Sequence, residues 1–278
     1  MTQAPFVAVQ QARTRQLVWP REHGAWGLLL VPLATGAWVG ACAGRTALPV
    51  LLFALATIAV FCLRTPVESL LGVSAIKVAN EAERNIALRY AFLFGAVSTV
   101  STAALWGGHL GLIALGGAAA LLFAVQVTIK RAGRRFRMAS QVIGALALTA
   151  TAPGAYYVAT GRFDLRAIGL WLAYWVFAGN QIHFVQLRLH SSKCGTWEEK
   201  FARGRGFFAG QTIMMLALTW AWAFGVLPAL VLIAFVPVFV RGVAWFFSRP
   251  RPLALHRLGM TELAHAIGFG VLLVAALR

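Results

Sequence analysis

Apolar residues gather along this chain in nine stretches separated by polar segments. A bilayer core about 30 Å thick needs about 20 apolar residues for each spanning helix. Lipid offers the backbone no hydrogen-bond partners, so each stretch is expected to be helical. The expected helices cover residues 24–42, 46–63, 89–106, 110–129, 139–159, 165–187, 206–224, 227–247 and 261–277. The pattern therefore predicts an all-α integral membrane protein, a nine-transmembrane-helix bundle.

The segments between these stretches alternate between short and long. The short ones are 43–45, 107–109, 160–164 and 225–226. The long ones are residues 1–22, 64–88, 130–138, 188–205 and 248–260. With nine crossings, each set lies on one side of the membrane. We expect residues 1–22 to be a cytoplasmic N-terminal segment and 23–278 to be a single transmembrane domain.

The positive charges follow the same alternation. Of the 25 Lys and Arg residues, 20 lie on the side of the long segments, four on the side of the short ones, and Arg241 falls within a stretch. Loops rich in Lys and Arg stay in the cytoplasm. The sequence therefore predicts a cytoplasmic N-terminus, an external C-terminus and a location in the bacterial inner (cytoplasmic) membrane. Arg241 is expected to extend toward the headgroups, without a functional role.

The composition excludes several classes of protein. Hydrophobic residues make up 60% of the chain and charged residues 12%, against about 25% charged in soluble domains. This argues against a disordered tail or a cytosolic enzyme. The net charge of +17 is not a sign of nucleic-acid binding, because little of the chain is left to form a solvated basic face.

Three polar clusters stand out near the predicted cytoplasmic side. Glu22 and His23 lie where the first stretch begins, and either cap that helix or face the bundle interior. Arg64 and Glu68 leave the second stretch, which Pro66 is expected to break. Together with Arg84 they form either a solvated loop or a cap over a cavity, with Arg64 or Arg84 holding an anionic headgroup.

The third cluster closes the sixth stretch. Asn180, His183 and Gln186 recur every three residues, close to one stripe of a helix, and Arg188 and His190 follow. Polar groups within a membrane are costly and usually face a cavity or bond a neighbouring helix. We therefore interpret these residues either as interhelical contacts or as the lining of a ligand site.

Metal and cofactor chemistry has weak support in the sequence. His23, His183 and His190 could hold a transition metal or haem, yet no compact ligand motif is present. We therefore assign no metal site, and the sequence does not identify a cofactor. The basic run at Lys130–Arg137 is expected to set topology and attract anionic lipid.

Residues 21–32, Arg-Glu-His-Gly-Ala-Trp-Gly-Leu-Leu-Leu-Val-Pro, resemble the signature of YwiC-like bacterial membrane proteins. More distantly, the chain resembles UbiA-type intramembrane prenyltransferases, at residues 21–32, at Gln141 to Pro153 and at Asn180 to Arg188. That resemblance implies a nine-helix fold with an external C-terminus and a cavity open to the cytoplasmic side. It also implies an isoprenoid substrate.

The UbiA-type enzymes bind a prenyl diphosphate through magnesium held by two Asp-rich motifs, and this sequence lacks both. The position of the first motif is occupied by Arg64, Thr65, Pro66 and Glu68. The position of the second is occupied by the amides Asn180, Gln181 and Gln186 together with His183. The whole chain contains one Asp, Asp164. Magnesium prefers carboxylate oxygens, so we expect no Mg²⁺-diphosphate site.

The sequence thus predicts a UbiA-like scaffold that binds or modifies a hydrophobic, isoprenoid- or quinone-like ligand. The partner is membrane lipid or an isoprenoid, and the oligomeric state is left open. The binding residues are expected to be Arg64, Glu68, Arg84, Asn180, Gln186 and Arg188. If the protein is an enzyme, Glu22, His23 and His183 are the catalytic candidates. The alternatives are a small-solute or proton-coupled transporter and an accessory subunit of a respiratory complex.

Overall fold

Helices account for all the regular structure in the described part of the chain. The computed structural model describes residues 13–20, 23–42, 47–74, 76–105, 111–192, 194, 196–248 and 253–277. Its elements are α2 (His23–Ala41), α3 (Ala47–Leu70), α4 (Glu81–Leu105), α5 (Gly111–Arg131), the 3-10 turn η1 (Arg134–Phe136), α6 (Arg137–Thr149), α7 (Thr151–Thr160), α8 (Leu165–His190), α9 (Trp197–Ala223), α10 (Ala229–Phe247) and α11 (Leu255–Leu277). The predicted all-α fold class is confirmed.

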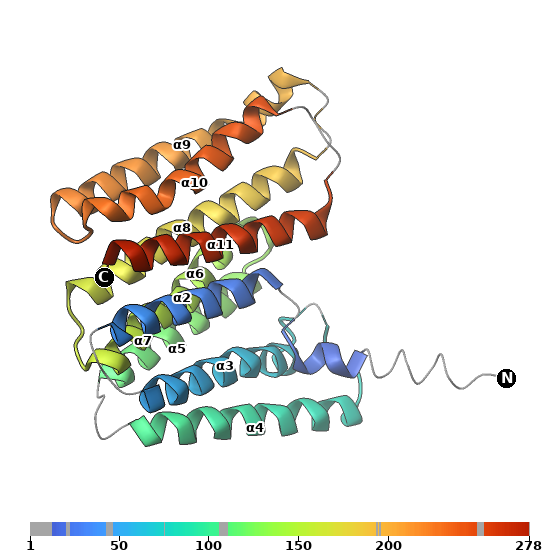
Figure 1. The fold of residues 1–278 in the computed structure, drawn as a ribbon. Helices are drawn as coiled ribbons and strands as arrows, with labels where there is room; N and C mark the ends of the chain where they lie inside the picture. Colours follow the sequence, from blue (N-terminus) through green and yellow to red (C-terminus); the bar gives the residue numbers. More distant parts are fainter. Residues whose placement is uncertain are drawn as a thin grey trace.

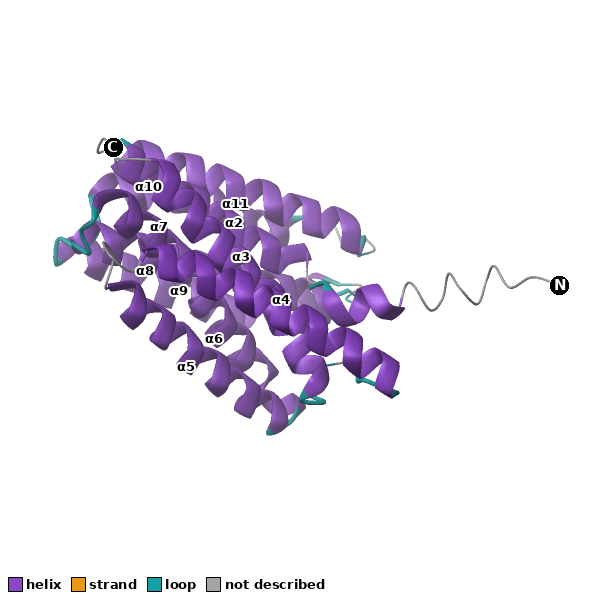
Figure 2. Cartoon of the chain, turned by 90° about the horizontal axis from the view of Figure 1, so that it is seen from below, coloured by secondary structure: helices purple, strands orange, loops and turns teal. Residues whose placement is uncertain are grey.

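The helices lie side by side in a bundle. Figure 1 shows α9 and α10 at one edge and α4 at the opposite edge, with α2, α8 and α11 between them. Figure 2, seen from below, shows α5 and α6 together, and these two helices pack against each other. The C-terminal ends of α3, α5, α8 and α10 lie at the end of the bundle where residues 13–20 are found (Figures 1 and 2). We call this end the N-terminal end.

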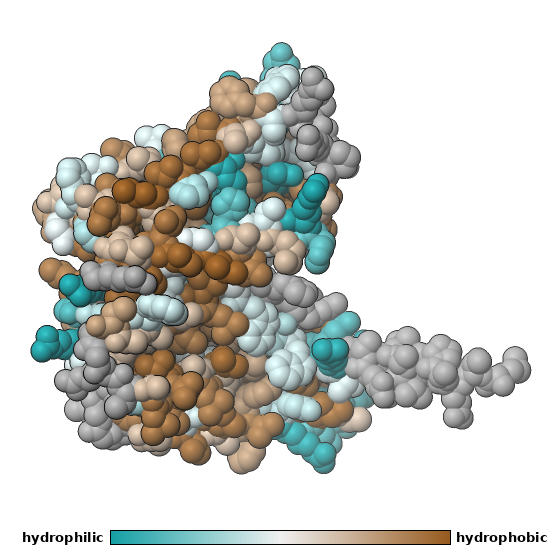
Figure 3. All heavy atoms as spheres, in the orientation of Figure 1, coloured by the Kyte–Doolittle hydropathy of each residue, from teal (hydrophilic) through white to brown (hydrophobic). Residues whose placement is uncertain are grey.

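Seven described segments are long and apolar enough to span a membrane: α2, α3, α4, α5, α6 together with α7, α10 and α11. Figure 3 shows hydrophobic side chains across the middle of the bundle and hydrophilic ones toward its ends. The chain is therefore a polytopic helical membrane protein. Helices α8 and α9, with 26 and 27 residues, are not among the seven, and both carry several polar residues.

The long segments of the sequence are more helical than predicted. Pro66 does not break α3, which continues through it to Leu70. A buried proline is tolerated in such a helix when its neighbours compensate for the lost backbone bond. Helix α4 begins at Glu81 rather than at 89, because Asn80 accepts a hydrogen bond from the backbone N–H of Glu83 at 2.8 Å and caps the helix.

The stretch expected as one helix over 139–159 forms two, α6 and α7, which meet at Ala150. Pro153 explains the break, since it has no N–H to donate to the carbonyl four residues earlier. The Thr151 hydroxyl donates to the Leu29 carbonyl at 3.0 Å, which ties the junction to α2. Helix α7 ends at Thr160 and is capped by Gly161, whose φ of +71° suits a residue without a Cβ.

Helices α2 and α7 approach each other unusually closely. A Cβ built on Gly36 would lie 2.0 Å from the Ala152 carbonyl oxygen, and one on Gly40 would lie 2.5 Å from the Ala159 Cβ. The two glycines are four residues apart and so share one face of α2. Small residues at this spacing let membrane helices come into backbone contact.

The largest hydrophobic cluster joins α2 and α7 to α8, α9, α10 and α11. Phe177 and Phe269 stack with their ring centroids 4.3 Å apart, and Tyr174 packs edge-on against Phe269. The Tyr174 hydroxyl also hydrogen-bonds the Thr35 hydroxyl at 2.5 Å. Helix α2 is therefore held on both sides.

Residues 13–19 pack on the first half of α4. Residues 13–18 are helical, and Leu17 and Val18 are buried. Arg13 donates to the Glu83 carboxylate at 2.5 Å, and Trp19 packs edge-on against Phe94. The hydrogen bond and the charge of Glu83 raise the pKa of Arg13 above its ordinary value, so Arg13 stays charged at physiological pH.

The α2–α7 contact predicts a position-specific cost for added volume. Gly36→Ala should lower the thermal unfolding temperature of the detergent-purified protein, because the new methyl group meets backbone and overpacking typically costs about 1–3 kcal/mol. Gly95→Ala on α4 is the matched control: its Cβ meets nothing within 4 Å, and alanine favours helix. Equal unfolding temperatures for the two variants would contradict the close contact.

Candidate functional site

A cavity of about 510 Å³ lies between the first helices of the bundle. Residues of α2, α3, α4, α5, α6 and the start of α7 form its walls. In sequence order, the first lining residue is Leu29 and the last is Thr151. Among the described residues that line it, Arg64 alone is charged. Its volume lies within the range of about 300–1,000 Å³ that is usual for ligand pockets.

The cavity is long and follows α3. Lining residues on this helix run from Phe53 to Val67, which at 1.5 Å per residue corresponds to about 21 Å. On the facing helix, α5, the small residues Gly116, Ala119 and Ala120 leave room for it. Helices α4 and α5 both line the cavity but make little close backbone contact with each other, whereas α3 packs closely on α4 and α5 on α6. The cavity therefore occupies the space between two helical hairpins.

One end of the cavity is polar, at the N-terminal end of the bundle. Arg64 donates through Nε to Glu68 Oε1 at 2.9 Å, and Lys130 of α5 donates through Nζ to the same oxygen at 2.7 Å. The Glu68 side chain is 11% exposed. Because α3 continues through Pro66, Arg64 and Glu68 share one helical face, and Lys130, which the sequence assigned only to a basic run, joins them.

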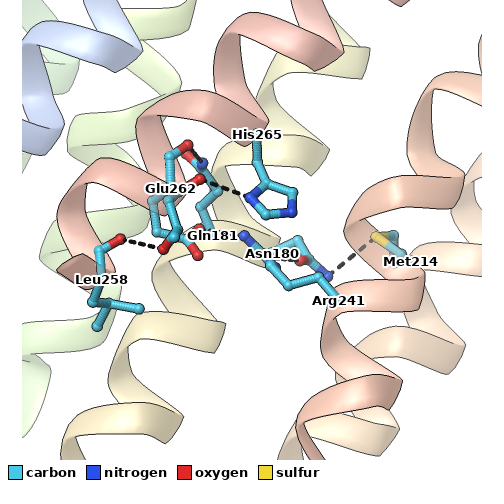
Figure 4. A network of polar contacts seen from close by, with 8 residues as sticks. Asn180, Gln181, Met214, Arg241, Leu258, Glu262 and His265 are labelled. Atoms are coloured by element: carbon cyan, nitrogen blue, oxygen red, sulfur yellow. Dashed lines mark hydrogen bonds and ion pairs between the residues drawn. The ribbon is translucent and has the colours of Figure 1, made fainter. Parts of the chain in front are cut away.

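A second polar cluster lies between α8, α10 and α11 (Figure 4). Arg241 forms an ion pair with Glu262 and donates through Nη2 to Asn180 Oδ1 at 3.0 Å. Its guanidinium also lies 4.3 Å from the centre of the Phe184 ring. Gln181 donates to the backbone carbonyl of Glu262 at 2.8 Å. These contacts join three helices that are far apart in the sequence.

The predicted role of Arg241 is wrong. Its side chain is only 9% exposed, so it turns into the bundle rather than toward the headgroups. Its partners lie 21 and 61 residues away, and no local pattern reveals them. The only signal in the sequence was that an Arg stands within an apolar stretch, which membrane proteins rarely allow without a partner.

The second cluster retains unsatisfied polar atoms. Arg241 Nε and Glu262 Oε1 are buried without a hydrogen-bond partner in the described part of the chain. Arg188 and His265 also lie within electrostatic reach of Glu262. The Glu262 carboxylate is therefore the negative charge that faces the guanidinium groups of both Arg241 and Arg188.

Asn180, His183 and Gln186 do not face one cavity. Asn180 contacts Arg241 and Met214, whereas His183 packs edge-on against Phe207 of α9 at 5.3 Å. Gln186 donates to Gln141 of α6 at 3.0 Å. A helix turns by about 100° per residue, so three residues fall about 60° short of a full turn. Side chains at this spacing therefore point in directions that differ by about 60° from one to the next. The expected stripe therefore splits among three neighbouring helices.

The other predicted site residues are dispersed. Arg84 is exposed and pairs with Glu81 at 3.5 Å; it does not line the cavity. The exposed His190 ring contacts the Gln186 carbonyl at 2.7 Å. Glu22 and the side chain of His23 lie outside the described residues. Within the described ranges, no three His, Cys, Asp or Glu side chains gather as metal ligands would.

The Arg241 cluster predicts a marked asymmetry between single and double substitution. Glu262→Gln leaves Arg241 buried without a counter-ion, and removal of one partner of a buried pair costs about 3–5 kcal/mol. Arg241→Met/Glu262→Met removes both charges and should recover most of the lost thermal stability. Glu198→Gln, at an exposed site on α9, should leave the unfolding temperature unchanged. A double variant no more stable than Glu262→Gln would refute this account.

The chain is similar to a known family over about half of its length. A family model described as YwiC-like protein matches residues 19–156. No curated protein and no solved structure gives a significant match. The matched range contains every described residue that lines the cavity, whereas Arg241 and Glu262 lie beyond it. Residues 19–156 thus place this polytopic membrane protein in the YwiC-like family.

Proposed function

We propose that this YwiC-like protein binds a hydrophobic, isoprenoid- or quinone-like lipid in the cavity between α3, α4, α5 and α6. The cavity itself is the observation that carries the proposal: it measures about 510 Å³, has a mostly apolar lining and has Arg64 as its one charged lining residue in the described part of the chain. A long apolar space with one polar end suits a chain with a polar head. The likeness to UbiA-type prenyltransferases supports the isoprenoid class by analogy alone.

The ligand enters from the bilayer, between α4 and α5. These helices line the cavity with little close backbone contact between them, so a chain passes between them without breaking an extensive helix interface. In the proposed topology α8 and α9 also span the membrane, which makes nine crossings. The cation-rich N-terminal end then faces the cytoplasm of a bacterial cell, and the polar end of the cavity lies at the inner leaflet.

The residues at the polar end fit binding better than magnesium-dependent transfer. Glu68 is the carboxylate nearest the cavity on α3, and Arg64 and Lys130 already bond it. Magnesium is usually held by carboxylates together with water and phosphate oxygens, and two cations beside the single carboxylate repel it. If the protein is a transferase, its chemistry does not use the Asp-rich motifs.

A proton-coupled transporter is the second candidate, and the Arg241–Glu262 pair favours it. Ionisable groups inside a membrane protein often mark an ion or proton pathway. A transporter would show substrate-dependent proton movement in proteoliposomes that Glu262→Gln abolishes. A lipid-binding protein would show none.

The proposed cavity predicts which glycine tolerates a large side chain. Gly116→Leu fills the cavity and should remove most of a lipid that co-purifies from native membranes, as measured by mass spectrometry of extracts. Gly117→Leu is the matched control on the same helix: its Cβ also meets open space, yet it does not line the cavity. Equal lipid content in the two variants and the native protein would refute the proposal.

A further inference from the structure

Gln126 of α5 is an uncharged polar residue near the polar end of the cavity. It lines the cavity, and it is only 7% exposed. It lies four residues before Lys130, which bonds Glu68 at that end, so Gln126 and Lys130 share one face of α5. A buried amide needs partners for both its nitrogen and its oxygen. The partners of Gln126 therefore bear on what this end of the cavity binds.

The amide of Gln126 is bonded through its nitrogen only. Nε2 donates to the backbone carbonyl of Ser140 at 3.2 Å. Because a carbonyl accepts but never donates, this contact fixes the amide nitrogen toward α6 and turns Oε1 away from Ser140. Gly144 of α6 leaves room for this placement, since a Cβ there would collide with the amide.

The oxygen of the same amide is left open. Oε1 of Gln126 has no hydrogen-bond partner in the described part of the chain. It is also not enclosed by protein, unlike Oε1 of Gln211 on α9. Since Gln126 lines the cavity, the space that remains open to Oε1 is the cavity itself.

The other polar groups of the lining have partners or lie far from this end. Arg64 donates to Glu68, and the hydroxyls of Thr57 and Thr151 donate to backbone carbonyls. The remaining lining hydroxyls belong to the half of α4 that is farther from the polar end, at Ser98 and Thr102. Among the described lining residues, Gln126 thus provides the open side-chain acceptor near the polar end.

An acceptor in this place selects a ligand that donates. A chain that fills the cavity removes water from Gln126 Oε1, and a buried acceptor without a donor is costly. A hydroxyl restores the lost hydrogen bond. A carbonyl, an ester or a deprotonated acid offers acceptors only, and an ammonium head would meet the like charges of Arg64 and Lys130.

We infer that the ligand of this cavity is a hydrophobic chain that ends in a neutral hydroxyl, and that Gln126 Oε1 accepts a hydrogen bond from that hydroxyl. This inference rests on the proposed function and narrows it. An isoprenoid alcohol and a quinol both carry such a hydroxyl, whereas an oxidised quinone carries none. Gln126 then determines specificity for the head of the ligand.

The test compares lipids that differ at the hydroxyl. Native mass spectrometry of the full chain in detergent measures binding of geranylgeraniol and of its methyl ether, which keeps the oxygen but cannot donate. Decylubiquinol and decylubiquinone, measured without air, form a second pair. We expect the hydroxyl form of at least one pair to bind about tenfold more tightly than its counterpart. The pair that shows the difference tells an isoprenoid alcohol from a quinol.

Two glutamine variants locate the preference. Gln126→Met keeps a side chain of similar length and removes the acceptor, so the hydroxyl form should lose its advantage while its counterpart binds no worse than to the native protein. Binding of that counterpart also shows that the variant is folded. Gln211→Met is the matched control and should keep the preference. Gln211 is likewise buried, with an Oε1 that has no partner in the described part of the chain, but it does not line the cavity.

The outcomes separate this inference from the proposed function. If both forms of each pair bind the native protein equally and Gly116→Leu weakens them all, the cavity takes hydrophobic ligands but hydroxyl recognition is wrong. A preference that survives in Gln126→Met would also overturn the inference, because the hydroxyl is then recognised elsewhere. If no lipid binds, or Gly116→Leu and Gly117→Leu behave alike, the proposed function fails as well.

Discussion

The close contact between α2 and α7 is the constraint on which the rest of the bundle depends. Gly36 and Gly40 bring the two backbones together, and the opposite side of α2 packs against α11. This places α2 between the cavity, whose wall includes Leu29, and the core around Tyr174. Because lipid provides little hydrophobic drive between helices, such fitted small residues decide which helices become neighbours.

The scarcity of acids shapes the electrostatics of the interior. The chain has eight acidic residues for 25 basic ones, and two of its buried carboxylates each lie beside more than one cation. Glu68 bonds both Arg64 and Lys130, and Glu262 pairs with Arg241 beside Arg188. Two clusters inside the bundle therefore each bring more than one cation close to a single carboxylate. One borders a cavity, and the other holds three helices together.

Hydropathy located the helices well because the bilayer imposes a single length scale on apolar segments. It failed where polar contacts decide the structure. The capping of α4 by Asn80 and the passage of α3 through Pro66 depend on groups outside the apolar windows. The Arg64–Glu68 pair was predictable, since residues four apart meet on a helix. Lys130, Arg241 and Glu262 find their partners across the bundle, and a single sequence carries no register between its helices.

Helix α6 connects the two polar groups while keeping them chemically apart. One face of α6 lines the cavity with Gly144 and Ala147. Another face meets α8, where Trp171 donates to the Leu146 carbonyl at 3.1 Å and Gln186 to Gln141. A larger residue at Gly144 would collide with Gln126 of α5, whose Nε2 lies 2.4 Å from the position that a Cβ would take. A ligand in the cavity would therefore rest on the same helix that orients α8, which carries Asn180 toward Arg241.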